Sequence, residues 1–178
     1  MSSPTPALDP VELGAYFSLI EATSLLRHSV ELQLKEAGDL SYIQFQLLAR
    51  LGDAPGGSHN MTELADGVVY SRSGLTYQAG LLEKAGLVTR APSADDERGT
   101  TVTITDAGRS RLAAVFPGHI EVLHRMLFDA ISREDIHTLE GLLTPVVQHM
   151  RAMPPRSASR RRAQGAATGG LAGGALRD

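Results

Sequence analysis

The segment 71–108 constrains the fold more than any other part of the chain, because its hydrophobic period changes twice. Apolar residues first recur at helical spacing after Ser71, a good helix cap, and this pattern stops at Gly86. A short strand, a charged loop and an alternating strand follow, before Thr105 begins another helix. The predicted elements are a helix over 71–86, strands over 87–91 and 101–105, and a charged loop over 93–99. The segment therefore predicts a helix followed by a β-hairpin with a charged tip.

A second short helix precedes this segment. Thr62 is expected to cap a helix that runs through Gly67, a few residues before Ser71. Two short helices joined by a tight turn form a helix-turn-helix. With the hairpin behind it, the pattern is typical of a winged helix-turn-helix, in which the helix from Ser71 is the recognition helix and the hairpin is the wing.

Several motifs of this region resemble the MarR (multiple antibiotic resistance regulator) family of transcription factors. They are SRSGLT at 71–76, LEKAGLV at 82–88, DERG at 96–99 and TDAG at 105–108, with MTELA at 61–65 similar to the family's preceding helix. The order and spacing of the motifs match, and the resemblance covers about residues 10–152. It implies a homodimer that binds double-stranded DNA.

Helices are also predicted on both sides of the winged helix-turn-helix. Asp9, Pro10 and Glu12 form a strong helix start, and the apolar period then lasts to about Glu36, a helix roughly 40 Å long. A capping box at 41–44 opens the next helix, which is expected to end at Leu51 before a loop over 53–59. Two further helices are expected from Thr105 to about Ala130 and from Ser132 to Met153.

The terminal helices contain more apolar residues than one small domain can bury. We therefore expect the first, fifth and sixth helices to build a dimer core, as the resemblance also implies. The fold class is mainly α with a small β-hairpin wing. The expected organisation is a disordered 1–8, a helical dimerisation region from 9–37 and 106–153, a DNA-binding region at 38–105, and a disordered Arg/Gly/Ala-rich tail at 154–178.

Composition excludes several classes of site. The chain has no cysteine, which excludes disulfides, thiolate metal sites and thiol-based redox sensing. It shows no signal peptide and no apolar run long enough to span a bilayer, so a cytoplasmic location is expected. The six histidines lack the spacing of a helical zinc pair, and no catalytic or phosphate-binding motif is present. We expect neither an enzyme, nor a metal, nor a bound cofactor.

Net charge argues mildly against a nucleic-acid partner. The chain carries −3; the tail 154–178 carries +4 from five arginines and one aspartate, which leaves −7 on residues 1–153. The segment 41–105 holds seven acids against five cations. DNA binding therefore requires local placement of cations, which dimerisation would double. The tail either adds non-specific DNA affinity or adds nothing.

The recognition helix is expected to bury Leu75, Leu82 and Ala79 and to present its other side to the major groove. The residues expected to contact DNA are Ser71, Arg72, Ser73, Thr76, Tyr77, Gln78, Lys84, Arg90, Asp96 and Arg98. Arginine pairs with guanine, glutamine with adenine, and the hydroxyl side chains reach bases or phosphates. The alternative interpretation is an ordinary solvated helix face. Gly80 departs from the family pattern: either it allows a close backbone approach or it has no role.

In the wing, the family resemblance implies that Arg98 enters the minor groove, where a narrow A·T tract attracts arginine. Asp96 is then expected to orient a cation, such as Arg98. Lys84 and Arg90 are expected to be phosphate clamps, which position the protein without reading sequence. The alternative interpretation of the wing tip is a solvated charged loop.

The resemblance also implies a small-molecule effector held between the dimer helices and the DNA-binding region. The candidate pocket residues are Tyr16, Arg27, His28, Tyr42, Gln46 and His119. An arginine with tyrosine and histidine would suit a small anionic aromatic molecule.

The sequence thus predicts a homodimeric, sequence-specific regulator that binds a pseudo-palindromic operator, and a repressor released by an effector. An activator or a regulator without a ligand fits the same residues. A winged-helix protein-interaction module without specific DNA binding is the alternative of a different class.

Overall fold

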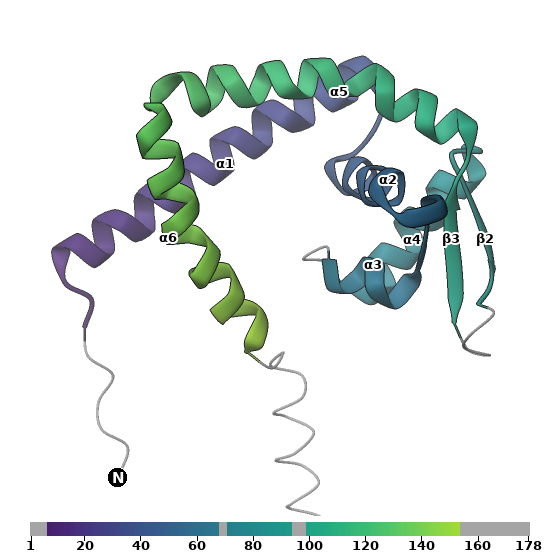
Figure 1. Cartoon of the computed structure of the whole chain (residues 1–178), viewed down its shortest axis with the longest axis horizontal. Helices are drawn as coiled ribbons and strands as arrows, with labels where there is room; N and C mark the ends of the chain where they lie inside the picture. Colours follow the sequence, from purple (N-terminus) through teal and green to yellow (C-terminus); the bar gives the residue numbers. More distant parts are fainter. Residues whose placement is uncertain (1–6, 68–70, 94–98, 154–178) are drawn as a thin grey trace, which may run out of the picture. The chain divides into compact units, whose positions relative to one another are not determined.

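The computed structural model describes residues 7–67, 71–93 and 99–153. The elements in chain order are α1 (Pro10–Gly38), α2 (Tyr42–Asp53), the 3₁₀ helix η1 (Pro55–Gly57), β1 (Ser58–Asn60), α3 (Met61–Gly67), α4 (Arg72–Lys84), β2 (Val88–Pro92), β3 (Thr100–Ile104), α5 (Asp106–Met126), the 3₁₀ helix η2 (Phe128–Ala130) and α6 (Arg133–Ala152) (Figure 1). The predicted mainly helical fold with a small β wing is confirmed. The chain divides into two compact units between Ala130 and Ile131, so α1 and α5 share a unit with the winged helix-turn-helix.

Helix α1 begins at the predicted capping box and lies along α5 (Figure 1). The Asp9 carboxylate accepts hydrogen bonds from the backbone N–H groups of Val11 and Glu12, at 2.7 and 2.9 Å. Near the other end of α1, buried Gly38 packs against Val115 of α5, and Arg111 donates a hydrogen bond to the Gly38 carbonyl. The long first helix is thus held at its C-terminal end by α5.

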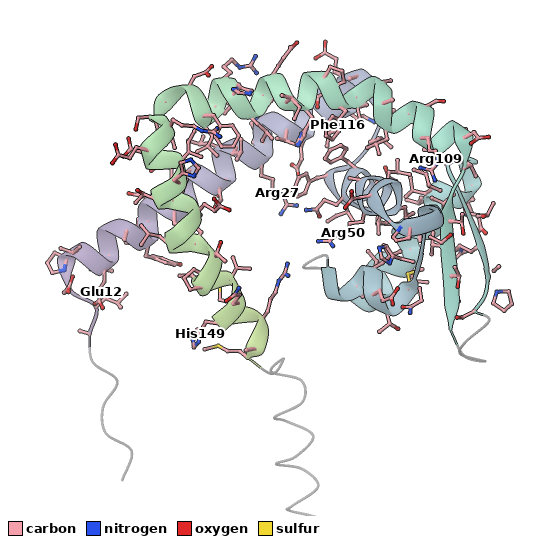
Figure 2. The ribbon with its side chains drawn as sticks, in the orientation of Figure 1. Glu12, Arg27, Arg50, Arg109, Phe116 and His149 are labelled. Atoms are coloured by element: carbon pink, nitrogen blue, oxygen red, sulfur yellow. The ribbon has the colours of Figure 1, made fainter. Side chains whose placement is uncertain are left out.

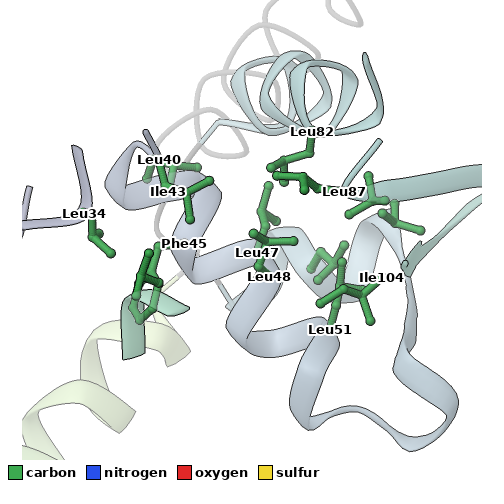
Figure 3. Packing of buried hydrophobic residues seen from close by; sticks show 14 of the residues in the cluster. Leu34, Leu40, Ile43, Phe45, Leu47, Leu48, Leu51, Leu82, Leu87 and Ile104 are labelled. Carbon is green, nitrogen blue, oxygen red and sulfur yellow. The ribbon is translucent and has the colours of Figure 1, made fainter. Parts of the chain in front are cut away.

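The hydrophobic core surrounds α2 (Figure 3). From α2 itself come the buried residues Ile43, Phe45, Leu47, Leu48 and Leu51. Around them lie Val30 and Leu34 of α1, Leu64 of α3, Leu75 and Leu82 of α4, Val102 and Ile104 of β3, and Val115 and Val122 of α5. Each fully buried aliphatic side chain stabilises the fold by roughly 1.5–3 kcal/mol relative to exposure. The core is aliphatic apart from Phe45, so α4 is fixed by leucine packing.

Two sequence predictions near α3 were wrong. Asn60, not Thr62, caps α3: its side chain accepts from the Glu63 N–H at 2.8 Å, and Glu63 accepts from the Asn60 N–H at 3.2 Å. The segment 53–59 is not only a loop, because β1 begins at Ser58 and pairs with β3, giving a three-stranded antiparallel sheet in the order β1-β3-β2. Three residues are too few for an alternating pattern, which is why β1 escaped detection.

Helix α5 starts at the Thr105 cap as predicted, but it ends at Met126 rather than near Ala130. Leu127 leaves the helical backbone conformation, and η2 follows. The described part of the second unit is α6 with its Ser132 capping box, and the larger apolar side chains Leu142, Val146, Val147 and Met150 of α6 are exposed in the single chain. None of the helices described is long and apolar enough to cross a membrane.

Substitution of two helical glycines by alanine should change the melting temperature in opposite directions. A Cβ at Gly108 would lie 2.1 Å from the Leu87 carbonyl oxygen, whereas a Cβ at Gly80 would find nothing closer than 3.9 Å. Gly80→Ala is therefore expected to raise the melting temperature by about 2–4 °C, since alanine is about 1 kcal/mol better in a helix. Gly108→Ala is expected to lower it through overpacking of about 1–3 kcal/mol. Thermal unfolding followed by circular dichroism checks both, and shifts of the same sign would contradict this packing.

Candidate nucleic-acid interface

Helix α4 is positioned by its two ends and by its buried side. Ser71 caps it by accepting a hydrogen bond from the Gly74 N–H at 3.2 Å. At its C-terminus Gly86 adopts a left-handed conformation, and Leu87 N–H donates to the Leu82 carbonyl at 2.9 Å, which closes a Schellman turn. The predicted inward side is confirmed, because Leu75, Ala79 and Leu82 are buried.

The opposite side of α4, here called its exposed face, is made of the exposed residues Ser73, Thr76, Tyr77 and Lys84 together with half-buried Gly80. These residues recur at intervals of three and four, so they lie along one side of the helix. Tyr77 stands out from it, with 65% of its surface exposed. The face is polar, carries one cation and presents a large aromatic ring, a set of groups suited to the floor and rim of a DNA groove.

Other predicted DNA contacts fall at the edge of this face or outside the described residues. Gln78 is half-buried, with its side-chain oxygen buried and without a hydrogen-bond partner among the described residues. The Arg72 side chain and the wing tip at 94–98, which includes Asp96 and Arg98, lie outside the described part. The two strands that lead to the tip are described, and Arg90 of β2 pairs with Val102 of β3. The expected DNA contacts therefore stay predictions.

Arg90 does not extend freely from the hairpin. Its Nε and Nη2 atoms donate hydrogen bonds to Oε2 of Glu83, at 2.8 and 2.5 Å. The hydrogen bond from Arg90 holds the pKa of the Glu83 carboxyl below its usual range. Sequence patterns did not single out Glu83, because the pair forms only once the Gly86 turn folds β2 back against α4.

The structure brings together only some of the candidate effector residues. The Arg27 guanidinium of α1 lies 5.4 Å from the centre of the Tyr42 ring of α2, and it also pairs with Glu31 at 2.8 Å. Tyr16 and His28 are exposed on α1, and Tyr16 packs edge-on against Phe17. Figure 2 shows Arg27 on α1 beside α2, and Arg109 well apart from it on α5. No single site gathering all six candidates is evident among these contacts.

His119 of α5 occupies a partly apolar environment. Its ring lies 4.5 Å from the Phe45 ring, centre to centre, and 6.4 Å from the Phe116 ring. Its Nδ1 atom is buried without a hydrogen-bond partner among the described residues. Burial lowers the pKa of His119 below its ordinary value of 6.5, so the neutral imidazole is favoured in the folded protein.

Hollows in the described surface do not suggest a metal centre. A hollow of about 390 Å³ lies between α2 and α5 and is lined by Gly52, Arg109, Leu112, Ala113, Phe116 and Pro117; Figure 2 labels two of these residues. Another, of about 430 Å³, is lined by residues 31, 35, 39–42 and 44, which include Tyr42. In the described ranges no group of three or more histidine or acidic side chains is placed to hold a metal ion.

The lowered pKa of His119 gives a signed prediction for stability. Because the unfolded chain binds the proton more readily, the free energy of unfolding should fall as the pH drops below about 6.5. His119→Leu removes this contribution, and its free energy of unfolding should depend less on pH. Urea unfolding of both proteins at pH 7.5 and pH 5.5 measures the difference. If the free energy of unfolding fell equally in the two proteins between pH 7.5 and pH 5.5, His119 would not be desolvated in the fold.

Comparison with known proteins gives a consistent result. A family model described as MarR family matches residues 38–99. The HTH-type transcriptional regulator MhqR of Bacillus subtilis is 28% identical over 101 residues, which cover 57% of this chain and 66% of MhqR, just under two thirds of that relative's length.

Two solved structures from Streptomyces coelicolor are similar over nearly the whole fold. AbsC, a MarR family transcriptional regulator, is 29% identical with a TM-score of 0.78, over 84% of this chain and 100% of its own. Sco3205, a MarR family regulator solved in complex with DNA, is also 29% identical with a TM-score of 0.78, over 87% of this chain and 96% of its own. The matched segment contains α2, the helix-turn-helix and β2, and the wider fold agrees as well. The chain is therefore similar to MarR family transcriptional regulators, in the segment 38–99 and in its fold.

Proposed function

We propose that this protein regulates transcription by binding a specific double-stranded DNA site as a homodimer. The observation that carries the proposal is the exposed face of α4, which is held outward by three buried residues and followed directly by a β-hairpin. A helix presented in this way can enter the major groove while the hairpin reaches the adjacent minor groove. The similarity to Sco3205, which was solved in complex with DNA, supports the same mode of binding here.

The dimer is proposed from uncovered apolar surface. Large apolar side chains are exposed in the single chain on three helices: Val11, Leu13, Tyr16, Phe17, Leu19, Ile20, Leu25 and Leu32 of α1, Phe116, Ile120 and Met126 of α5, and Leu142, Val146, Val147 and Met150 of α6. Large apolar side chains left exposed on a helix often mark interaction sites. A second copy that covers them would place two recognition helices on a pseudo-palindromic operator, with half-sites about one helical turn apart.

Repression and release by a small molecule form the finer part of the proposal. A dimer that covers a promoter blocks transcription, and an effector that changes the spacing of the recognition helices releases it. The pair of Arg27 and Tyr42 supplies a cation and an aromatic ring at the junction of α1 and α2, which suits a small anionic aromatic effector.

An interaction module without DNA is the second candidate, and the charge balance favours it. Residues 1–153 carry a net charge of −7, the whole-chain −3 less the +4 of the tail, which opposes a polyanionic partner. The two functions differ in salt dependence, because only DNA binding releases counterions from phosphates.

Fluorescence anisotropy tests the proposed function. The purified protein is titrated into labelled DNA from upstream of its own gene and into a scrambled duplex of the same composition, at two salt concentrations. Binding at least about a hundredfold tighter to the native duplex supports a specific regulator. Equal binding that fades together as salt rises would place the operator elsewhere or assign the affinity to the basic tail. No binding at either salt would favour the interaction module.

Arg98→Ala tests the proposed wing contact on that same operator. Loss of an arginine from the minor groove should weaken binding at least about tenfold while the melting temperature stays unchanged. Arg125→Ala on α5, an exposed arginine away from the proposed face, is the control with the same change of charge. An unchanged affinity for Arg98→Ala would remove the wing from the mechanism.

A further inference from the structure

Arg90 and Glu83 join the recognition helix to the wing. Glu83 lies in the last turn of α4, and Arg90 lies on β2 beyond the Gly86 turn. Two nitrogens of the guanidinium share one carboxylate oxygen, at 2.8 and 2.5 Å, and both side chains are only partly exposed, at 30% for Arg90 and 37% for Glu83. A two-nitrogen contact of this kind fixes the plane of the guanidinium as well as its position.

The Arg90 guanidinium lies beside Gly80 of α4. A Cβ at position 80 would lie 3.9 Å from Nη2 and 4.0 Å from Nη1 of Arg90, so the charged group lies over the bare backbone of the helix. Gly80 is one turn from Tyr77 and from Lys84 on the exposed face of α4. The arginine of the wing strand therefore presents its charge beside the surface proposed to meet DNA.

The geometry leaves donors for a second anion. A guanidinium has five N–H donors; among the described residues, Glu83 accepts one hydrogen bond from Nε and one from Nη2, so the Nη1 group remains for another acceptor. A phosphate oxygen matches this group in charge and hydrogen-bonding capacity. Because the arginine is already held, little rotamer freedom would be lost when the phosphate arrives.

We propose that Glu83 is a positioning residue that holds Arg90 against α4, so that its Nη1 group donates to a DNA phosphate. The inference rests on the proposed DNA-binding function and deepens it.

The sign of the effect separates positioning from simple repulsion. Glu83 is an acid near the proposed DNA surface, so Coulomb repulsion alone predicts that its removal tightens binding. Positioning predicts the reverse, because an unheld arginine must be ordered when DNA binds. Glutamine keeps an acceptor at the same reach without the charge, so it should partly preserve the position.

The test measures operator affinity of Glu83→Ala, Glu83→Gln and Arg90→Ala over a range of salt concentrations. Positioning predicts that affinity decreases from wild type to Glu83→Gln to Glu83→Ala, with Glu83→Ala weakened about three- to tenfold. The slope of log K against log salt should become shallower by roughly one for both Glu83→Ala and Arg90→Ala, as for the loss of one phosphate contact. The double variant should bind no more weakly than Arg90→Ala.

Asp53→Asn at the end of α2 is the control, because it also removes one exposed negative charge but has no part in the Arg90 contact. Melting temperatures and circular dichroism confirm that each variant is folded, and Arg90→Ala gives an independent reading if Glu83→Ala is unstable. Tighter or equal binding by Glu83→Ala, or an unchanged salt slope for Arg90→Ala, overturns the inference while the wild type still binds its operator. Failure of the wild type to bind specifically would instead overturn the proposed function.

Discussion

The arrangement of the proposed interface depends on one packing constraint, the burial of Leu75, Ala79 and Leu82 of α4 in the core around α2. These three residues fix the rotation of the helix about its axis, because successive positions differ by about 100°. A rotation by one residue would expose a leucine and bury polar groups without partners, at a cost of several kcal/mol. The same packing that stabilises the fold therefore selects the side chains on the exposed face of α4, the face proposed to meet DNA.

A second constraint places the hairpin relative to α4. The Leu87 carbonyl, directly after the left-handed Gly86, accepts a hydrogen bond from the Thr105 N–H at 3.1 Å and lies against Gly108. The end of α4, the start of β2 and the start of α5 thus meet at one turn. The contact between Glu83 and Arg90 adds a polar connection across that turn. Local placement of this kind would let a chain with a net negative charge present a cation at the proposed DNA surface.

Sequence patterns predicted the elements whose signals are local. Five helix caps appear where they were expected, because a cap depends on a few adjacent residues. These caps are Asp9, Ser41, Ser71, Thr105 and Ser132. The strand β1 and the Asn60 cap were missed. The partner of β1 lies more than 40 residues away, as the pairing of Ser58 with Thr103 shows, and three residues carry no period of their own.

The site was predicted to a similar extent. The buried and exposed sides of α4 follow from helical period alone. Glu83 could not be found in this way, because its contact with Arg90 depends on the turn at Gly86. The effector candidates were the least constrained by sequence: they come from three helices, and only the contact of Arg27 with Tyr42 brings two of them together.

The central claim is that the exposed face of α4 enters the DNA groove. Photo-crosslinking tests it most directly, with a benzoylphenylalanine in place of Tyr77 and, as the matched control, in place of Arg125 on α5. The account predicts that the protein labelled at position 77 crosslinks to operator DNA but not to a scrambled duplex at moderate salt, and that the protein labelled at position 125 crosslinks to neither. Crosslinking from position 125 alone, or equal crosslinking from position 77 to both duplexes, would contradict it.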